Sequence, residues 1–340
     1  MTQPVPQFRE QAGKQVVVVS DPLPDDTLAG LRPYEVRHCD GSDPRALREA
    51  LKDAHALLMR SGTKADAEAI ATAPNLRVIA RAGVGLDNVD VAAATRAGVL
   101  VANAPHSNVL SVAELTIGLI IASLRKTYAA GASLRAGNWE RAAFKGSELA
   151  GRTVGIVGFG NVGKLVARRL AAFDTPLVAH DPYAPPQDAE RLGVRLMELD
   201  ELMSTSDVIT VHLPKTPETT GLIGRRELGL AKSTAHLVNT SRGGIVDEEA
   251  LAVALREGRI AGAALDVFEI EPAIGSPLLD LPSVTGTPHL GASTKEAQER
   301  AGHEAVQAVC NALEGKPVAH AVNAADVTPR ASEHAAPRIS

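Results

Sequence analysis

The sequence predicts an α/β protein with parallel sheets in two domains. Short β-branched runs alternate with longer segments rich in Ala, Leu and Arg, which is typical of βαβ units. A glycine-rich turn directly follows one of these apolar runs near the middle of the chain. The 340 residues are enough for two domains, since one domain usually takes about 100–200 residues. Aromatic residues make up only 3% of the chain, so Ala, Val, Leu and Ile must form the cores.

The first third of the chain predicts one small α/β unit. Its apolar runs are expected to form strands over Val16–Ser20, Ala56–Met59, Val78–Ala80 and Val99–Ala102. Helices are expected between them, for example over Pro44–Asp53 and Asp90–Ala97. A long helix is then expected over Ser111–Tyr128. The stretch Ala129–Leu149 contains three glycines and the single tryptophan, Trp139, and is expected to be an extended arm outside the core.

A second α/β series begins at Thr153. Its strands are expected over Val154–Val157, Leu177–His180, Val208–His212, Ala235–Asn239, Ala263–Asp266 and Ser283–Gly286. The last helix, Lys295–Leu313, is followed by a Gly and Pro stop signal. Residues 324–340 are rich in Ala, Pro and polar residues and are expected to be disordered.

Composition excludes several classes of partner. The chain has 35 Lys and Arg against 40 Asp and Glu and lacks a basic block, so nucleic acid is not an expected partner. Cys39 and Cys310 have no closely spaced partner, which excludes a disulfide framework and a cysteine-type zinc site; we expect no metal. No apolar run has the length of a signal peptide or a membrane span. We therefore expect a soluble, cytoplasmic protein that binds no membrane.

The strongest local motif is Gly158-x-Gly160-x-x-Gly163, which follows an apolar strand and opens a helix pattern. In such a turn the first glycine permits the tight bend, the second lets a pyrophosphate approach the backbone, and the third allows close packing. Asp181 ends the next expected strand, where an acid can bind the ribose hydroxyls and repel a 2′-phosphate. No arginine closely follows Asp181, so the motif predicts an NAD site rather than an NADP site.

Three further residues could together bind and react with a 2-hydroxy acid. Arg242 follows an apolar strand, and Glu271 and His289 come later in the chain. A guanidinium can bind a substrate carboxylate and polarise its carbonyl, an imidazole can exchange a hydroxyl proton at neutral pH, and a carboxylate can hold that imidazole in place. Each residue taken singly also suits a structural role. Arg242 could form a surface ion pair, Glu271 could simply precede a proline, and His289 could be an ordinary loop histidine.

The sequence resembles the D-isomer-specific 2-hydroxyacid dehydrogenases from about Val16 to Asn323. Besides the glycine loop, the stretches that carry the resemblance are Arg81–Asp90, Ser111–Thr116, Ser241–Asp247, Ala264–Phe268 and His289–Thr294. Within the family it is most similar to the members that oxidise 3-phospho-D-glycerate to 3-phosphohydroxypyruvate with NAD. The resemblance makes Arg242 the substrate clamp, His289 the acid/base and Glu271 its partner.

The resemblance also implies the domain organisation. It implies two Rossmann-like or flavodoxin-like parallel-sheet domains with a cleft between them. Residues 1–107 and 288–323 would form a discontinuous substrate domain, and residues 108–287 the NAD-binding domain. The arm near 129–149 would pair subunits into a homodimer or tetramer. The cofactor would be bound by Val84, Gly158, Gly160, Asn161, Val162, Gly163, Asp181, Leu213, Pro214, Thr240, Ser241, Arg242, Asp266, His289, Gly291 and Ala292, with Asp266 on the nicotinamide carboxamide.

Two departures from the family pattern are noted. Asn161-Val162 stands where family members often carry Arg-Ile, which removes one cation from the pyrophosphate site. His106-Ser107 stands where related enzymes tend to have Asn-Gly, so His106 is either a substrate contact or a neutral loop residue. We also expect no regulatory extension after the last helix.

The choice of substrate depends on arginines in the first domain. Arg60 and Arg81 each follow an expected strand, where two guanidiniums would suit a doubly charged phosphate. The substrate site would then comprise Arg60, Arg81, Gly83, Asn108 and Arg242, with Arg141 as a possible third cation from the partner subunit. Surface ion pairing of the arginines is the structural alternative. A hydroxypyruvate or glyoxylate reductase, a phosphonate dehydrogenase and a non-catalytic NAD-sensing protein are the functional alternatives.

Overall fold

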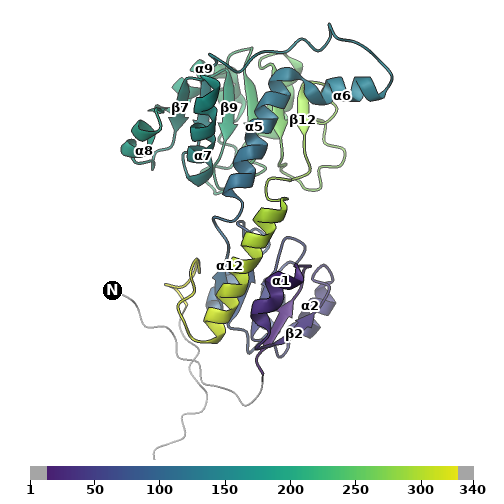
Figure 1. The fold of residues 1–340 in the computed structure, drawn as a ribbon, viewed down its shortest axis with the longest axis vertical. Helices are drawn as coiled ribbons and strands as arrows, with labels where there is room; N and C mark the ends of the chain where they lie inside the picture. The colour runs from purple at the N-terminus through teal and green to yellow at the C-terminus, as the bar shows by residue number, and fades with distance from the viewer. Residues whose placement is uncertain (1–13, 328–340) are drawn as a thin grey trace, which may run out of the picture. The chain divides into compact units, whose positions relative to one another are not determined.

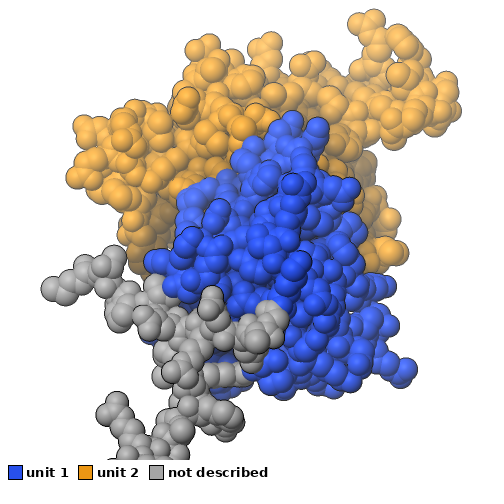
Figure 2. Space-filling model, turned by 60° about the horizontal axis from the view of Figure 1, so that its bottom comes forward, with its two compact units in different colours: residues 1–108, 295–340 blue, residues 109–294 orange. Residues whose placement is uncertain are grey.

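The computed structural model describes residues 14–327, which form two compact units. Unit 1 combines residues up to 108 with those from 295 onwards, and unit 2 comprises residues 109–294 (Figure 2). Residues 288–294, which we expected in the first domain, thus lie with unit 2. From position 328 onwards, the segment expected to be disordered lies outside the described residues.

Unit 1 is built on a five-stranded parallel sheet with the order β2-β1-β3-β4-β5, which is the flavodoxin-like order. The strands are β1 Val16–Val19, β2 Glu35–His38, β3 Ala56–Met59, β4 Val78–Arg81 and β5 Leu100–Ala102. The helices are α1 Asp25–Leu28, the 3₁₀ helix Ala29–Leu31, α2 Pro44–Leu51, α3 Ala67–Ala71, α4 Val91–Arg96 and α12 Lys295–Leu313.

Small residues let the helices of unit 1 approach the sheet and one another. Helix α12 packs against β3 and β4 and beside α1 (Figure 1). Its buried face includes Ala297, Ala301, Ala305, Ala308 and Ala312, which recur at three- and four-residue spacing. A Cβ on Gly302 would lie 2.5 Å from Thr27 of α1, so glycine is needed for this contact. The alanine-rich composition thus sets how closely helix and sheet pack.

Unit 2 is built on a seven-stranded parallel sheet with the order β12-β11-β10-β9-β6-β7-β8. The strands are β6 Val154–Val157, β7 Leu177–His180, β8 Arg195–Leu196, β9 Val208–Val211, β10 His236–Asn239, β11 Gly262–Leu265 and β12 Val284–Gly286. The helices are α5 Val109–Arg125, α6 Thr127–Arg135, α7 Asn161–Leu170, the 3₁₀ helix Ala171–Phe173, α8 Pro186–Arg191, α9 Leu199–Thr205, α10 Arg225–Leu230 and α11 Glu248–Arg256.

The strand order of unit 2 reverses at β6, which lies between β7 and β9. Helices α5 and α7 pack side by side on this sheet, with a shared core of Leu, Ile, Val and Ala side chains (Figure 1). In open parallel sheets, ligands bind outside the carboxyl ends of the strands at such a reversal. The topology therefore directs attention to the loops that follow β6, β9 and β10.

The predicted fold class is confirmed, with both sheets parallel throughout. Each strand expected from the sequence is present, with ends shifted by no more than one residue. The edge strands β2 and β8 were missed because β2 is partly exposed and polar and β8 has only two residues. The helix expected over Ser111–Tyr128 ends at Arg125, because Lys126 adopts a left-handed conformation with a φ of 53°.

The arm expected after this helix begins as a second helix, α6, rather than as an extended segment. Helix α6 has no buried residue. Among residues 14–327, no helix is both long and apolar enough to cross a membrane.

Candidate active site

The glycine loop joins β6 to α7 at the reversal point of the sheet in unit 2. Gly158 has a φ of +94°, and a Cβ there would lie 2.6 Å from the carbonyl oxygen of His212. A Cβ on Gly163 would lie 2.2 Å from the carbonyl oxygen of Gly158. A Cβ on Gly160, by contrast, would meet nothing within 4 Å. Two of the glycines are therefore needed for packing, and the third leaves an open backbone surface.

That open surface coincides with the start of α7. Gly160 is the N-cap residue of this ten-residue helix, and no side chain caps it. The first backbone N–H groups of a helix attract negative charge, which is why such ends bind phosphates. Asn161 and Val162 add no cation here. The open cradle at Gly160 fits the pyrophosphate of a dinucleotide, held by the backbone rather than by an arginine.

Asp181 lies beside this loop at the end of β7. Its Oδ2 accepts a hydrogen bond of 2.8 Å from the backbone N–H of Phe159, and its Oδ1 accepts one of 2.9 Å from that of Tyr183. The carboxylate thus fixes the glycine loop, and each oxygen keeps a lone pair for a further donor such as a ribose hydroxyl.

The loop that carries Arg242 is organised by Asn239, the last residue of β10. The side-chain oxygen of Asn239 accepts hydrogen bonds from the N–H and the hydroxyl of Ser241, and its side-chain N–H donates to the carbonyl oxygen of Arg242. Thr240 is buried and lies 2.7 Å, oxygen to oxygen, from the hydroxyl of Thr116. We did not single out Asn239 from the sequence; a polar residue closing an apolar strand was the available signal.

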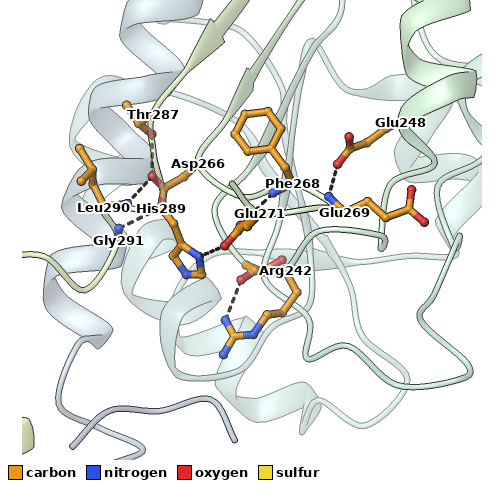
Figure 3. Close-up of polar contacts among 11 residues, drawn as sticks. Arg242, Glu248, Asp266, Phe268, Glu269, Glu271, Thr287, His289, Leu290 and Gly291 are labelled. Atoms are coloured by element: carbon orange, nitrogen blue, oxygen red, sulfur yellow. Dashed lines mark hydrogen bonds and ion pairs between the residues drawn. The ribbon is translucent and has the colours of Figure 1, made fainter. Parts of the chain in front are cut away.

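Glu271 and His289 form a hydrogen-bonded pair. Nδ1 of His289 lies 2.7 Å from Oε2 of Glu271, and Figure 3 shows the imidazole directed at the carboxylate. The other carboxylate oxygen accepts a hydrogen bond from the backbone N–H of Phe268 at 3.1 Å. Because Nδ1 faces the carboxylate, Nε2 is the ring nitrogen that can act on a substrate. The pair is half-exposed, as a site that exchanges protons with a ligand requires.

Asp266 holds the turn that carries His289. The carboxylate is fully buried and accepts hydrogen bonds from the Thr287 hydroxyl at 2.6 Å and from the N–H groups of Leu290 and Gly291 at 2.7 and 2.8 Å (Figure 3). Its carbonyl oxygen accepts from the N–H of His289, whose φ is 53°. Asp266 therefore acts on the histidine turn, and a contact with the nicotinamide stays a prediction.

The Arg242 loop and the Glu271 segment interlock through Gly243. A Cβ on Gly243 would lie 1.8 Å from the carbonyl oxygen of Phe268, so only glycine fits. Glu248, the first residue of α11, accepts a hydrogen bond from the backbone N–H of Glu269 (Figure 3). Burial and the nearby carboxylates of Glu269 and Glu271 raise the pKa of Glu248. The sequence analysis missed Glu248, which sits one residue after the α11 N-cap.

A pocket of about 650 Å³ opens beside the pair. Glu271 and His289 form its polar part, and most of the remaining wall is apolar, including Phe268, Ile274 and Leu279.

Two of the substrate residues expected in unit 1, Arg60 and Arg81, lie at the carboxyl ends of two neighbouring strands. Arg60 follows β3, and its backbone N–H and one guanidinium nitrogen donate to the Asp21 carboxylate and the Pro22 carbonyl oxygen, at 2.7 and 3.2 Å. Arg81 ends β4 and pairs in register with Met59. Its guanidinium covers Gly83, where a Cβ would lie 2.1 Å from Nη1.

The other residues of unit 1 that the sequence singled out lie in the loops after β4 and β5. The carbonyl oxygen of Val84 accepts a hydrogen bond from the Asn103 side chain at 2.6 Å. Arg300 on α12 donates to the carbonyl oxygen of Ser107 at 2.9 Å, beside Asn108. This third guanidinium was not singled out from the sequence, because its helix lies about two hundred positions away. His106 makes an edge-to-face contact with the ring of His320.

Comparisons with known proteins agree with this geometry. Residues 117–291 match the family described as "D-isomer specific 2-hydroxyacid dehydrogenase, NAD binding domain". The chain is 52% identical over 309 residues to D-3-phosphoglycerate dehydrogenase of Mycobacterium leprae, covering 91% of this chain and 58% of that protein. It is 46% identical over 289 residues to the enzyme of the same name from Rattus norvegicus, covering 85% and 54%. The chain thus spans a little over half the length of these relatives.

Two solved structures share the fold over most of both chains. A protein of Thermus thermophilus superposes with a TM-score of 0.84 at 36% identity, covering 91% of this chain and 100% of that one. A glyoxylate reductase of Paecilomyes thermophila superposes with a TM-score of 0.83 at 29% identity, covering 91% and 98%.

Proposed function

Because the chain belongs to the D-isomer-specific 2-hydroxyacid dehydrogenase family, we propose that it is an NAD-dependent oxidoreductase that converts 3-phospho-D-glycerate to 3-phosphohydroxypyruvate. The observation that carries the proposal is the pair of His289 and Glu271, 2.7 Å apart, in the same unit as a glycine loop open for a pyrophosphate. The curated relatives named D-3-phosphoglycerate dehydrogenase support this choice of substrate.

The residues of unit 2 divide the chemistry among them. The glycine loop and Asp181 would hold NAD, which would supply the acceptor for the hydride that leaves C2 of the hydroxy acid. Nε2 of His289 takes the proton of the C2 hydroxyl, and the Glu271 carboxylate stabilises the imidazolium that results. Arg242 binds the substrate carboxylate through its guanidinium. Hydride and proton together account for the two hydrogens removed from the alcohol.

Arg60 and Arg81 are proposed to bind the phosphate of the substrate. A dianionic phosphate is well matched by two planar guanidiniums, and these two follow neighbouring strands of one sheet. Asn108 and Gly83 would complete the site, and Arg141, which is exposed on the arm, is proposed as a cation contributed by the partner subunit.

A glyoxylate or hydroxypyruvate reductase is the second candidate, favoured by the structural likeness to the glyoxylate reductase. A panel of 2-hydroxy and 2-keto acids, followed through NADH absorbance, separates the two. The proposal expects the highest kcat/KM with 3-phospho-D-glycerate or 3-phosphohydroxypyruvate. Higher kcat/KM with glyoxylate or hydroxypyruvate would overturn the phosphate assignment and leave the family activity intact.

We propose that the arm pairs two copies of the chain, in the cytoplasm. Helix α6 has no fully buried residue, and the large apolar side chains of Leu134 and Trp139 on the arm are 57% and 79% exposed. Both cysteines are free thiols, as is usual in a reducing compartment. Sedimentation of the purified protein should give a dimer or tetramer, and Leu134→Glu should shift it towards monomer; a wild-type monomer would refute the pairing.

A further inference from the structure

A second pocket in unit 2, of about 240 Å³, lies at the opposite edge of the sheet from the glycine loop. Its lining includes His236, the first residue of β10, and Ala261 and Ser283, which immediately precede β11 and β12. The amino ends of parallel strands share one edge, whereas the glycine loop follows the carboxyl end of β6. None of the residues that line this pocket belongs to the candidate active site.

The lining combines hydroxyls, an imidazole and an ammonium. The Ser123 hydroxyl at the end of α5 lies 2.7 Å from Nδ1 of His236. Ser283 and Thr285 bring two more hydroxyls, and Lys126 brings its ammonium group. No Asp or Glu lines the pocket, and no carboxylate of residues 14–327 forms an ion pair with Lys126.

The surrounding charges make the pocket electropositive. Burial, Arg152 and Lys126 lower the pKa of His236 to about 4, in that order of importance. Asp207, which immediately precedes β9, accepts hydrogen bonds from Lys232 at 3.0 Å and from the N–H of Thr153 at 2.9 Å, and Arg152 also acts on its carboxylate. Lys126, the cation in the pocket lining, therefore has no carboxylate within that lining to balance its charge.

We propose that this pocket binds a small oxyanion, a phosphate or carboxylate group, on Lys126, with Ser123 and His236 as hydrogen-bonding partners. A tetrahedral or planar oxyanion can accept from the ammonium, from hydroxyls and from an imidazole N–H at once. The volume admits a small organic acid or phosphate and excludes a dinucleotide. None of the pocket residues takes part in the chemistry proposed above, although Ala129, Ala143 and Phe144 of its lining belong to the arm that is proposed to pair subunits.

Anion binding and protonation of His236 must be linked. An anion a few ångströms from the imidazole favours the charged ring and raises its pKa by about 1 or more. By reciprocity, protonating His236 tightens anion binding by the same factor, which is about tenfold where the anion raises the pKa by 1.

Titration of His236 by NMR tests this directly. Protein with ¹³C-labelled histidine is titrated between pH 3 and pH 8 in sodium sulfate and in sodium chloride of equal ionic strength. Sulfate is the probe because its charge is constant over this range. The His236 signal is the one absent from His236→Gln. Sulfate should raise its titration midpoint by about 1 pH unit relative to chloride.

Lys126→Met supplies the decisive comparison, because methionine keeps the side-chain length and removes the charge. In this variant the sulfate-dependent rise should disappear, and the chloride midpoint should rise because a cation has gone. Arg256→Met removes a cation from the last turn of α11, outside the pocket lining and the arm, and should behave like the wild type. Unchanged turnover of both variants verifies folding. The same midpoint in sulfate and chloride, or a sulfate effect that survives in Lys126→Met, would overturn the proposal.

Discussion

Nδ1 of His289 lies 2.7 Å from Oε2 of Glu271, although 18 positions separate the two residues. The pair depends on two separate backbone supports. Phe268 N–H anchors the Glu271 carboxylate, and the buried Asp266 carboxylate anchors the turn after His289. Both supports lie in or directly after the loop that leaves β11, so one strand end positions the whole pair. Such support holds a proton-transferring group in place before the substrate arrives.

His289→Ala should lower kcat by about 10²–10⁴-fold, the usual contribution of a general acid–base. NADH binding, measured by fluorescence titration, should change little, because the glycine loop and Asp181 are untouched. Gly160→Val, which places a side chain in the open cradle at the start of α7, is the comparison that should weaken NADH binding more than it lowers kcat. A His289→Ala variant with near-normal kcat would remove the mechanism proposed for this site.

Glu248 is a positioning residue in this scheme, since it touches the backbone of Glu269 and not the substrate. Glu248→Ala removes the acceptor and should lower kcat by about tenfold, equivalent to about 1.4 kcal/mol, with KM nearly unchanged. Glu248→Gln keeps an acceptor oxygen and should recover most of that loss. Equal kcat losses in the two variants would mean that the charge, rather than the hydrogen bond, is what matters.

Sequence alone predicts those parts of this fold that are fixed by local pattern. The central strands are apolar and fully buried, so runs such as Val154–Val157 identify them. The edge strand Glu35–His38 has no such run, and the break at Lys126 carries no Gly or Pro. The contact between Ser123 and His236 could not be foreseen, because it depends on the order in which strands and helices pack.

The lowered pKa of His236 predicts that the folded protein loses stability in acid. The ordinary histidine pKa of the unfolded chain is near 6.5, and the folded value is about 4. Between these values the unfolded chain binds more protons, so stability is complete above pH 6.5 and falls as pH falls towards 4. Urea unfolding at pH 7 and pH 5 should show a smaller difference in unfolding free energy for His236→Gln than for the wild type.

In the same unfolding experiment, a second histidine contributes to the acid destabilisation of both the wild type and the variant. His212 is half-buried, and burial lowers its pKa to about 3, so it destabilises both proteins equally in acid. An identical pH 7 to pH 5 difference in His236→Gln and wild type would show that His236 titrates normally in the folded chain.

Asp181 should set the preference for NAD over NADP. Asp181→Ala removes both the ribose acceptor and the repulsion of a 2′-phosphate, so the ratio of kcat/KM with NADP to that with NAD should rise. Asp181→Asn keeps one acceptor for the Phe159 N–H and removes only the charge. The ratio should therefore rise in both variants, with the loss of NAD activity smaller in Asp181→Asn. A ratio that stays constant in both would refute the ribose assignment.

Arg60 and Arg81 should discriminate phosphorylated from unphosphorylated substrates. Removing one guanidinium from a charge-assisted pair with phosphate costs about 1.5–3 kcal/mol, or about a 10–150-fold loss of kcat/KM for 3-phosphohydroxypyruvate. Part of this loss can appear in kcat, because remote binding energy also orients the reacting carbon. Hydroxypyruvate has no phosphate to place there and should lose far less. The ratio of kcat/KM for the two substrates in Arg60→Ala and Arg81→Ala therefore separates the phosphate contact from general damage to the protein.

Arg96→Ala, in the last turn of α4, is the matched control and should leave this ratio unchanged. Equal losses on both substrates would make the two arginines structural and would favour a general 2-hydroxyacid dehydrogenase over one specific for phosphoglycerate.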